Sequence, residues 1–120
     1  MGVFNKKNKV DIDLQAISTL ISKGAVLEGN VKAPAFARVD GQINGDVAVD
    51  EGLILGENGI INGHVNTKEM VVYGVVTGNI NVQSLQIKST GKISGDIKTS
   101  VLAIETGAVY NGKLLMHTAV

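Results

Sequence analysis

The chain has 120 residues, a formal net charge of zero at pH 7 and no cysteine. These properties exclude disulfides and thiolate metal sites, and they give no electrostatic basis for binding nucleic acid. Aromatic residues make up only 3% of the chain whereas 15 residues are glycine, so the composition suits short strands and tight corners better than a core filled with aromatic rings.

Residues 1–18 are predicted to form a flexible N-terminal tail. Asp11 and Asp13 follow its basic start where a signal peptide would have an apolar stretch, so we expect a cytoplasmic protein. The first nine residues combine apolar and basic side chains, which predicts attachment to the inner face of the cytoplasmic membrane; a solubilising tail is the alternative. The candidate membrane-binding residues are Met1, Val3, Phe4, Lys6, Lys7 and Lys9.

Residues 11–22 are open to two interpretations. Leu14, Ile17 and Ile21 are spaced as on one face of a helix, which predicts a short helix. Alternatively, the tail runs directly into a first strand within this segment.

A repeat of 15 to 18 residues occupies the rest of the chain. A second column of apolar residues follows nearly the same spacing, and we predict that its members stack in the interior: Leu20, Phe36, Leu53, Met70, Leu85 and Leu102. Each copy of the repeat also contains a glycine between two polar residues, and these glycines are Gly29, Gly45, Gly63, Gly78, Gly95 and Gly112.

Around each glycine the sequence alternates between apolar and polar residues, as in a strand with one buried face. Two residues before the glycines lie Leu27, Ile43, Ile61, Val76, Ile93 and Tyr110. Two residues after them lie Val31, Val47, Val65, Ile80, Ile97 and Leu114. No copy is long enough to bury its own apolar face or to hold a crossover helix. The sequence therefore predicts an all-β fold, a parallel β-helix of about six turns over residues 19–116, with a short tail at 117–120.

The last copy of the repeat differs from the others because its end is apolar. Leu115 stands where the other copies have Lys32, Ala48, Asn66, Asn81 or Lys98, and Tyr110 replaces an aliphatic residue. Soluble repeat proteins normally end in a polar cap, and an uncovered edge is a template for another chain. We predict a polymerisation interface at the two ends, formed by Leu20, Ile21, Leu27, Tyr110, Leu114, Leu115 and Met116.

Three other patterns are interpreted as structural rather than chemical. Residues 107–113, GAVYNGK, match the start of a phosphate-binding loop, but Leu114 follows where Ser or Thr would be needed. His64 and His117 have no converging partners in the sequence. The acidic cluster at residues 50–57 lacks the alternating oxygen ligands of a cation loop, so it is predicted to be a solvated corner. We expect no catalytic activity, no cofactor and no metal.

Four stretches resemble the core domain of the bactofilin family: VDGQINGDV, GENGIINGHV, STGKISGDIKT and ETGAVYNGKLLM. The resemblance spans about residues 19–116. It implies a right-handed β-helix that assembles into non-polar filaments without nucleotide, with head-to-head and tail-to-tail contacts. It also implies membrane association and a scaffolding role alongside cell-wall or morphogenesis proteins. Right-handed winding is also the general preference of parallel crossovers.

Two alternative functions compete with that of a structural polymer. A left-handed β-helix acyltransferase is disfavoured because such enzymes use a strict six-residue period, whereas the spacing here varies from 15 to 18. A monomeric β-helix module that binds cell-wall polysaccharide or partner proteins on one flat face is the second alternative.

Overall fold

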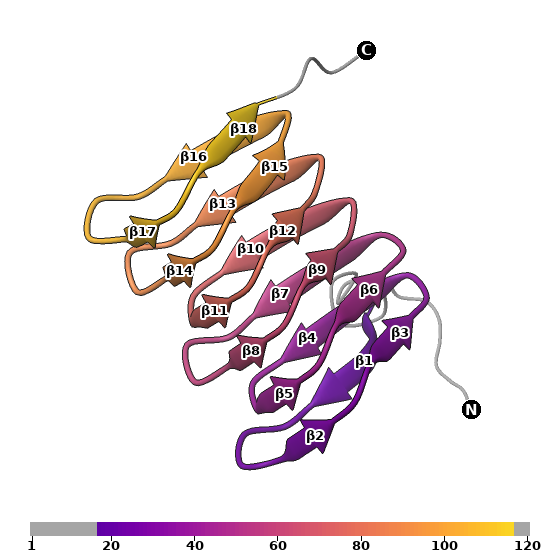
Figure 1. Ribbon diagram of the computed structural model, residues 1–120. Coiled ribbons are helices and arrows are strands. Elements are labelled where there is room, and N and C mark those ends of the chain that lie inside the picture. The colour runs from indigo at the N-terminus through magenta and orange to yellow at the C-terminus, as the bar shows by residue number, and fades with distance from the viewer. Residues whose placement is uncertain (1–16, 117–120) are drawn as a thin grey trace, which may run out of the picture.

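The computed structural model describes residues 17–116, and within them the chain forms 18 short strands. The strands wind into a coil of six turns, in which each turn contributes one strand to each of three parallel sheets. Figure 1 shows the turns advancing from β1 to β18 as a right-handed solenoid. The predicted all-β parallel β-helix is therefore confirmed.

The three sheets each contain six strands, one above the other along the coil. Sheet A consists of β1 (Ile17–Ile21), β4 (Phe36–Val39), β7 (Gly52–Leu55), β10 (Glu69–Val72), β13 (Ser84–Ile87) and β16 (Val101–Ile104). Sheet B consists of β2 (Val26–Glu28), β5 (Gln42–Asn44), β8 (Ile60–Asn62), β11 (Val75–Thr77), β14 (Lys92–Ser94) and β17 (Val109–Asn111). Sheet C consists of β3 (Val31–Ala33), β6 (Val47–Val49), β9 (Val65–Asn66), β12 (Ile80–Asn81), β15 (Ile97–Thr99) and β18 (Leu114–Met116).

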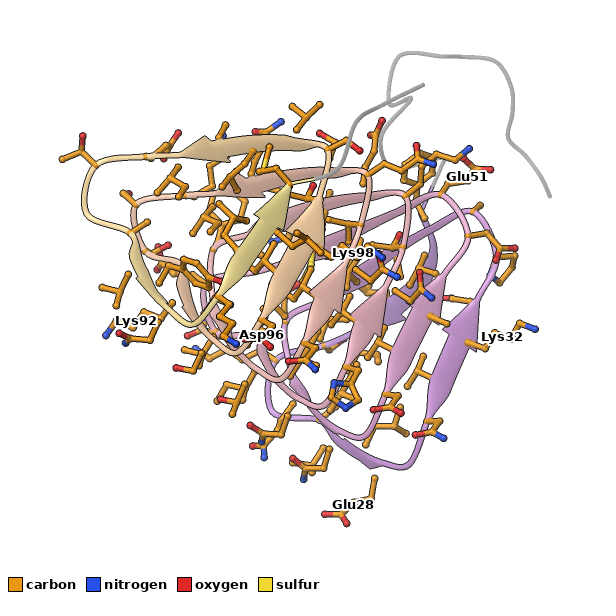
Figure 2. All side chains as sticks on the ribbon, turned by 45° about the horizontal axis from the view of Figure 1, so that its top comes forward. Glu28, Lys32, Glu51, Lys92, Asp96 and Lys98 are labelled. Carbon is orange, nitrogen blue, oxygen red and sulfur yellow. The ribbon has the colours of Figure 1, made fainter. Side chains whose placement is uncertain are left out.

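The register of sheets B and C confirms the columns predicted around the glycines. In sheet B, Val76 pairs with Ile61 on one side and Ile93 on the other. In sheet C, Ile80 pairs in the same way with Val65 and Ile97. All six side chains are at most 1% exposed, so stacked aliphatic columns fill the interior. Polar side chains of the alternating positions project outward, as Figure 2 shows for Glu28, Lys32 and Lys92.

The apolar column predicted for sheet A is wrong in its first two members. The last four members do form a column, in which each residue pairs with the next one along the coil: Leu53, Met70, Leu85 and Leu102. However, Leu53 pairs with Ala37 on its other side, and not with Phe36. Phe36 instead lies on the outer face, where its ring occupies the space left by the missing side chain of Gly52. Leu20 pairs with Arg38, an outward position, and is 62% exposed.

The glycine column allows successive turns to approach closely at the corner between sheets B and C. Gly78 has a φ of 145°, a conformation that side chains rarely adopt, and a Cβ there would collide with the carbonyl oxygen of Gly63. The same collision recurs at the later and earlier turns, except at Gly29, which has no turn before it in the part of the chain that the structure describes. The glycine column therefore marks the positions at which the backbones of successive turns approach most closely.

The segment at the start of the coil is a strand and not a helix in the part that the structure describes. β1 begins at Ile17, and a register irregularity lies between Ile17 and Thr19. The helical interpretation of residues 11–22 is therefore wrong for residues 17–21, while residues 11–16 lie outside the described range.

Candidate assembly surfaces

Each end of the coil leaves three strands paired on one side only. These edge strands are β1, β2 and β3 at the N-terminal end, and β16, β17 and β18 at the C-terminal end. Backbone N–H and C=O groups that point along the coil axis have no further turn to bond with at these strands. Such edges are templates for pairing with another chain unless a loop, helix or charge covers them. Nothing among residues 17–116 covers either end.

The C-terminal turn presents its interior side chains to solvent. Ile104 is 49% exposed, Leu114 41% and Met116 48%, although all three continue interior columns. One turn earlier, the equivalent residues Ile87 and Ile97 are at most 1% exposed. The exposed apolar surface therefore consists of interior columns that no further turn among residues 17–116 covers, and not of outward-facing side chains.

Tyr110 closes part of this open end. It continues the column of Ile93, packs against the core, and its hydroxyl donates a hydrogen bond to the carbonyl oxygen of Lys113. Burial raises the pKa of Tyr110 above its ordinary value, an effect that a backbone hydrogen bond at Ile97 opposes. The ring and its polar tip are therefore held in place at the open end, where an aromatic residue contributes a large contact area.

Leu115 occupies a different place from its neighbours in β18. It pairs with Lys98 in an outward column of sheet C and is 59% exposed. Leu114 and Met116 face the open end, whereas Leu115 lies on the outer face beside it. Of the predicted C-terminal interface residues, Leu115 alone is thus a rim residue.

The N-terminal end presents a smaller apolar surface. Leu27 is 40% exposed at the start of the interior column of sheet B, and Ile21 is half-buried against the core. Leu20 lies on the outer face of sheet A rather than at the open end. Val31, which sequence reasoning did not assign to the interface, is half-buried at the same end.

Three residues of the C-terminal surface were also missed by sequence reasoning. Leu102, Ile104 and Ala108 complete the open end on the side of sheet A. The alternation of side chains along β16 places Leu102 and Ile104 on the same face of the strand. Which face points inward follows only from the register of sheet A.

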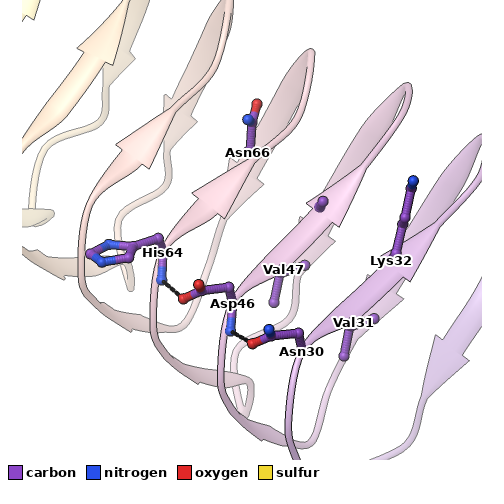
Figure 3. A pocket seen from close by; sticks show the side chains of 8 residues that line it. Asn30, Val31, Lys32, Asp46, Val47, His64 and Asn66 are labelled. Carbon is purple, nitrogen blue, oxygen red and sulfur yellow. Dashed lines mark hydrogen bonds between the residues drawn. The ribbon is translucent and has the colours of Figure 1, made fainter.

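A ladder of hydrogen bonds follows the corner between sheets B and C, immediately after the glycine column. At each turn a backbone N–H donates to the side chain of the equivalent residue one turn earlier: Asp46 to Asn30 (3.0 Å), His64 to Asp46 (3.0 Å), Asn79 to His64 (3.1 Å), Asp96 to Asn79 (3.1 Å) and Lys113 to Asp96 (3.2 Å). Figure 3 shows its first two bonds. We call these residues the corner ladder.

The corner ladder also gives His64 a defined role. His64 is exposed. Its Nδ1 atom accepts the hydrogen bond from the Asn79 N–H through a ring lone pair. His64 thus substitutes for the Asn and Asp acceptors of the other turns.

Grooves lie between the corner ladder and the outward column of sheet C. One, of about 430 Å³, extends from Asn30 and Lys32 to His64 and Asn66 (Figure 3), and another, of about 490 Å³, lies beside Lys98 and Leu115. Their walls are amide, carboxylate and ammonium groups with aliphatic floors. They hold no arrangement of a nucleophile, a base and an oxyanion site.

The other patterns noted in the sequence also have structural positions. Residues 107–113 form β17 and its flanking corners, the sixth copy of the repeat. Asp50, Glu51 and Glu57 are exposed, and the Glu51 carboxylate lies 3.5 Å from the Lys68 ammonium. Residues 17–116 contain no cluster of metal-ligating side chains and no helix long and apolar enough to cross a membrane. His117 and the six predicted membrane-binding residues lie outside the described range.

These features define a class: a parallel β-solenoid whose two ends are apolar and unpaired. The family model for bactofilins, described as polymer-forming cytoskeletal proteins, matches residues 19–115. The chain belongs to the bactofilin family, which confirms the resemblance and the structural, cytoskeletal character expected from it.

Two relatives from Myxococcus xanthus (strain DK1622) are similar to this chain. Bactofilin BacP is 28% identical over 100 residues, which cover 82% of this chain and 42% of BacP. Bactofilin BacO is 26% identical over 100 residues, which cover 82% of this chain and 79% of BacO. The chain therefore spans less than half the length of BacP.

Two solved structures of Thermus thermophilus bactofilin share the fold. A cryo-EM reconstruction of its double helical filaments matches with a TM-score of 0.80 and 24% identity, over 82% of this chain and 99% of that one. A crystal structure of a point mutant matches with a TM-score of 0.70 and 23% identity, over 72% and 98%.

Proposed function

We propose that this bactofilin is a cytoskeletal scaffold that polymerises end to end through its two open turns, without nucleotide, metal or other cofactor. The observation that carries the proposal is the exposure of Ile104, Leu114 and Met116 at the end of otherwise buried columns. Burying the remaining half of each side chain contributes about 1 kcal/mol apiece. The three edge strands at each end add backbone hydrogen bonds, each with a net value of about 1 kcal/mol.

The joints of the proposed filament pair like ends with like ends. Family membership supports this arrangement, in which a two-fold axis brings the same patch of each subunit onto itself. A joint between two C-terminal ends then buries Tyr110, Leu114 and Met116 twice, with Leu115 at its rim. A joint between two N-terminal ends buries Ile21 and Leu27 twice, with Leu20 beside it.

Charge at the C-terminal end tests the proposed joint. Tyr110→Arg places a cation against its own copy across the two-fold axis, and we expect it to convert filaments into species no larger than dimers that still show a β-type circular dichroism spectrum. Leu115→Arg, at the rim, should shorten filaments without abolishing them. The measurement is sedimentation and negative-stain electron microscopy of pure protein at neutral pH without nucleotide.

A matched control separates the joint from the outer surface. Asn81→Arg adds the same charge to the outward column of Leu115, two turns from the end, and should leave filaments unchanged. If Tyr110→Arg and Leu115→Arg both assemble like the original chain, the C-terminal end is not a joint. A requirement for ATP, GTP or a metal ion contradicts the other half of the proposal.

We further propose that residues 1–9 attach the filament to the inner face of the cytoplasmic membrane. Burial of Phe4 and part of Val3 contributes about 2–3 kcal/mol, and Lys6, Lys7 and Lys9 contribute about 1 kcal/mol each near anionic lipid. Asp11 and Asp13 reduce this total to roughly 4–5 kcal/mol, which corresponds to a dissociation constant near the millimolar range. One tail is too weak to anchor a monomer, whereas the many tails of a filament bind together.

Liposome co-sedimentation tests the membrane proposal. With vesicles containing anionic lipid, the complete chain should pellet strongly, and added salt should weaken the binding. A chain lacking residues 1–9 and the Tyr110→Arg chain should both remain largely in the supernatant. Unchanged pelleting after the deletion would show that the tail is not the anchor. If the Tyr110→Arg chain pellets as strongly as the complete chain, binding does not depend on many tails acting together in a filament.

A second candidate function is a binding module that uses the sheet C grooves. Their volumes of about 430 and 490 Å³ lie in the range of small-ligand sites, and their amide and charged walls suit a cell-wall polysaccharide or a polar segment of a morphogenesis protein. A monomer that never sediments, but whose groove resonances shift on addition of soluble glycan fragments in NMR spectra, would favour this function over polymerisation.

A further inference from the structure

The corner ladder has a direction, and its two ends do not match. Every side chain in it accepts a hydrogen bond from the next turn toward the C-terminus, from Asn30 through Asp96. At the N-terminal end, the Asn30 N–H would need an acceptor from a preceding turn, and it has none among residues 17–116. At the C-terminal end the acceptor position is occupied by Lys113.

A lysine ends the ladder because its ammonium group carries three donors and no acceptor. If a second subunit continued the coil, with its N-terminal turn on the C-terminal turn of the first, Lys113 would occupy the place of the Asn, Asp and His acceptors. The Asn30 N–H of the added subunit would then face a cation instead of a lone pair. An N–H group that loses water without gaining an acceptor is destabilising.

We infer that Lys113 determines which partner the C-terminal end accepts, because it disfavours the N-terminal end of a second copy of this chain. A joint between like ends brings no corner-ladder N–H onto Lys113 in the ladder register, so it does not incur this mismatch. The inference rests on the proposed end-to-end assembly, and it assigns the choice between like and unlike ends to a single side chain.

Two end-blocked proteins allow the mismatch to be measured directly. Leu27→Arg has only its C-terminal end free, and Tyr110→Arg has only its N-terminal end free. Native mass spectrometry of the mixture distinguishes homodimers, formed by like ends, from the heterodimer, formed by unlike ends. We expect homodimers to predominate and the heterodimer to be a minor species. When Lys113→Asn is added to the Leu27→Arg protein, an acceptor is restored and the amount of heterodimer should increase about two- to tenfold, the value of one net hydrogen bond.

Two matched variants in the Leu27→Arg protein separate the acceptor from the charge. Lys113→Met removes the charge without supplying an acceptor, and Lys98→Asn makes the same substitution outside the corner ladder. Neither variant should increase the amount of heterodimer. The inference is overturned if Lys113→Asn gives no increase, or if Lys113→Met or Lys98→Asn gives an equal one. If neither end-blocked protein forms any dimer, it is the proposed assembly that fails.

Discussion

The variant Val76→Asp is expected to lose a large part of the stability of the fold. Val76 has no exposed surface and lies in the middle of the interior column of sheet B. The change loses about 2 kcal/mol of apolar burial and places an unpaired carboxylate among aliphatic side chains, for a total of more than about 4 kcal/mol. A domain of this size has only about 5–15 kcal/mol of stability. Circular dichroism and urea denaturation measure the loss.

The control for this variant is its neighbour Thr77→Asp. Thr77 is exposed and points to the opposite face of the same strand, so the same carboxylate should change the free energy of unfolding by less than about 0.5 kcal/mol. Equal stability of the two variants would mean that the inward and outward columns are wrongly assigned.

The variant Gly78→Ala is expected to lose about 2–5 kcal/mol of stability. An alanine at a positive φ costs about 1–2 kcal/mol, and its Cβ would collide with the carbonyl oxygen of Gly63 in the turn before. Relief of that collision requires the turns to separate at the corner, which costs a further 1–3 kcal/mol or so. Urea denaturation again provides the measurement.

Gly29→Ala isolates the contribution of the collision. Gly29 also has a positive φ, of 122°, but no atom lies within 4 Å of an added Cβ because Gly29 belongs to the first turn. We expect it to cost only the backbone strain, about 1–2 kcal/mol. Both variants are compared in a chain carrying Leu27→Arg and Tyr110→Arg, so that assembly does not contribute. A loss as large as that of Gly78→Ala would show that close stacking at the corner is not the reason for the glycine column.

The interior of sheets B and C could be predicted from the sequence because their strands alternate cleanly around an invariant marker, the glycine. The start of sheet A could not. Phe36 and Ala37 are adjacent and both apolar, so the period does not reveal which faces inward. The choice depends on Gly52, one turn later, whose missing side chain leaves space for the Phe36 ring on the outer face.

The assembly surfaces could be predicted in part. The last copy of the repeat departs from the others, and this difference identifies Tyr110, Leu114 and Met116. Ile104, in contrast, is aliphatic like Ile87, the residue before it in its column. Its exposure arises because no further turn among residues 17–116 covers it. The corner ladder was visible as a column of polar residues, but its hydrogen bonds join residues 15 to 18 positions apart, and a single repeat contains no sign of them.

Hydrogen–deuterium exchange of the filament would show which strands lie at the joints. Compared with a chain carrying Leu27→Arg and Tyr110→Arg, we expect the assembled protein to gain protection in peptides from β1–β3 and β16–β18, because edge strands that lack partners on one side acquire them. Peptides from β8 and β11, which are paired on both sides in the single subunit, should exchange equally in the two proteins. Protection gained along the outer faces of the central turns, with β16–β18 still exchanging rapidly, would contradict assembly through the ends of the coil.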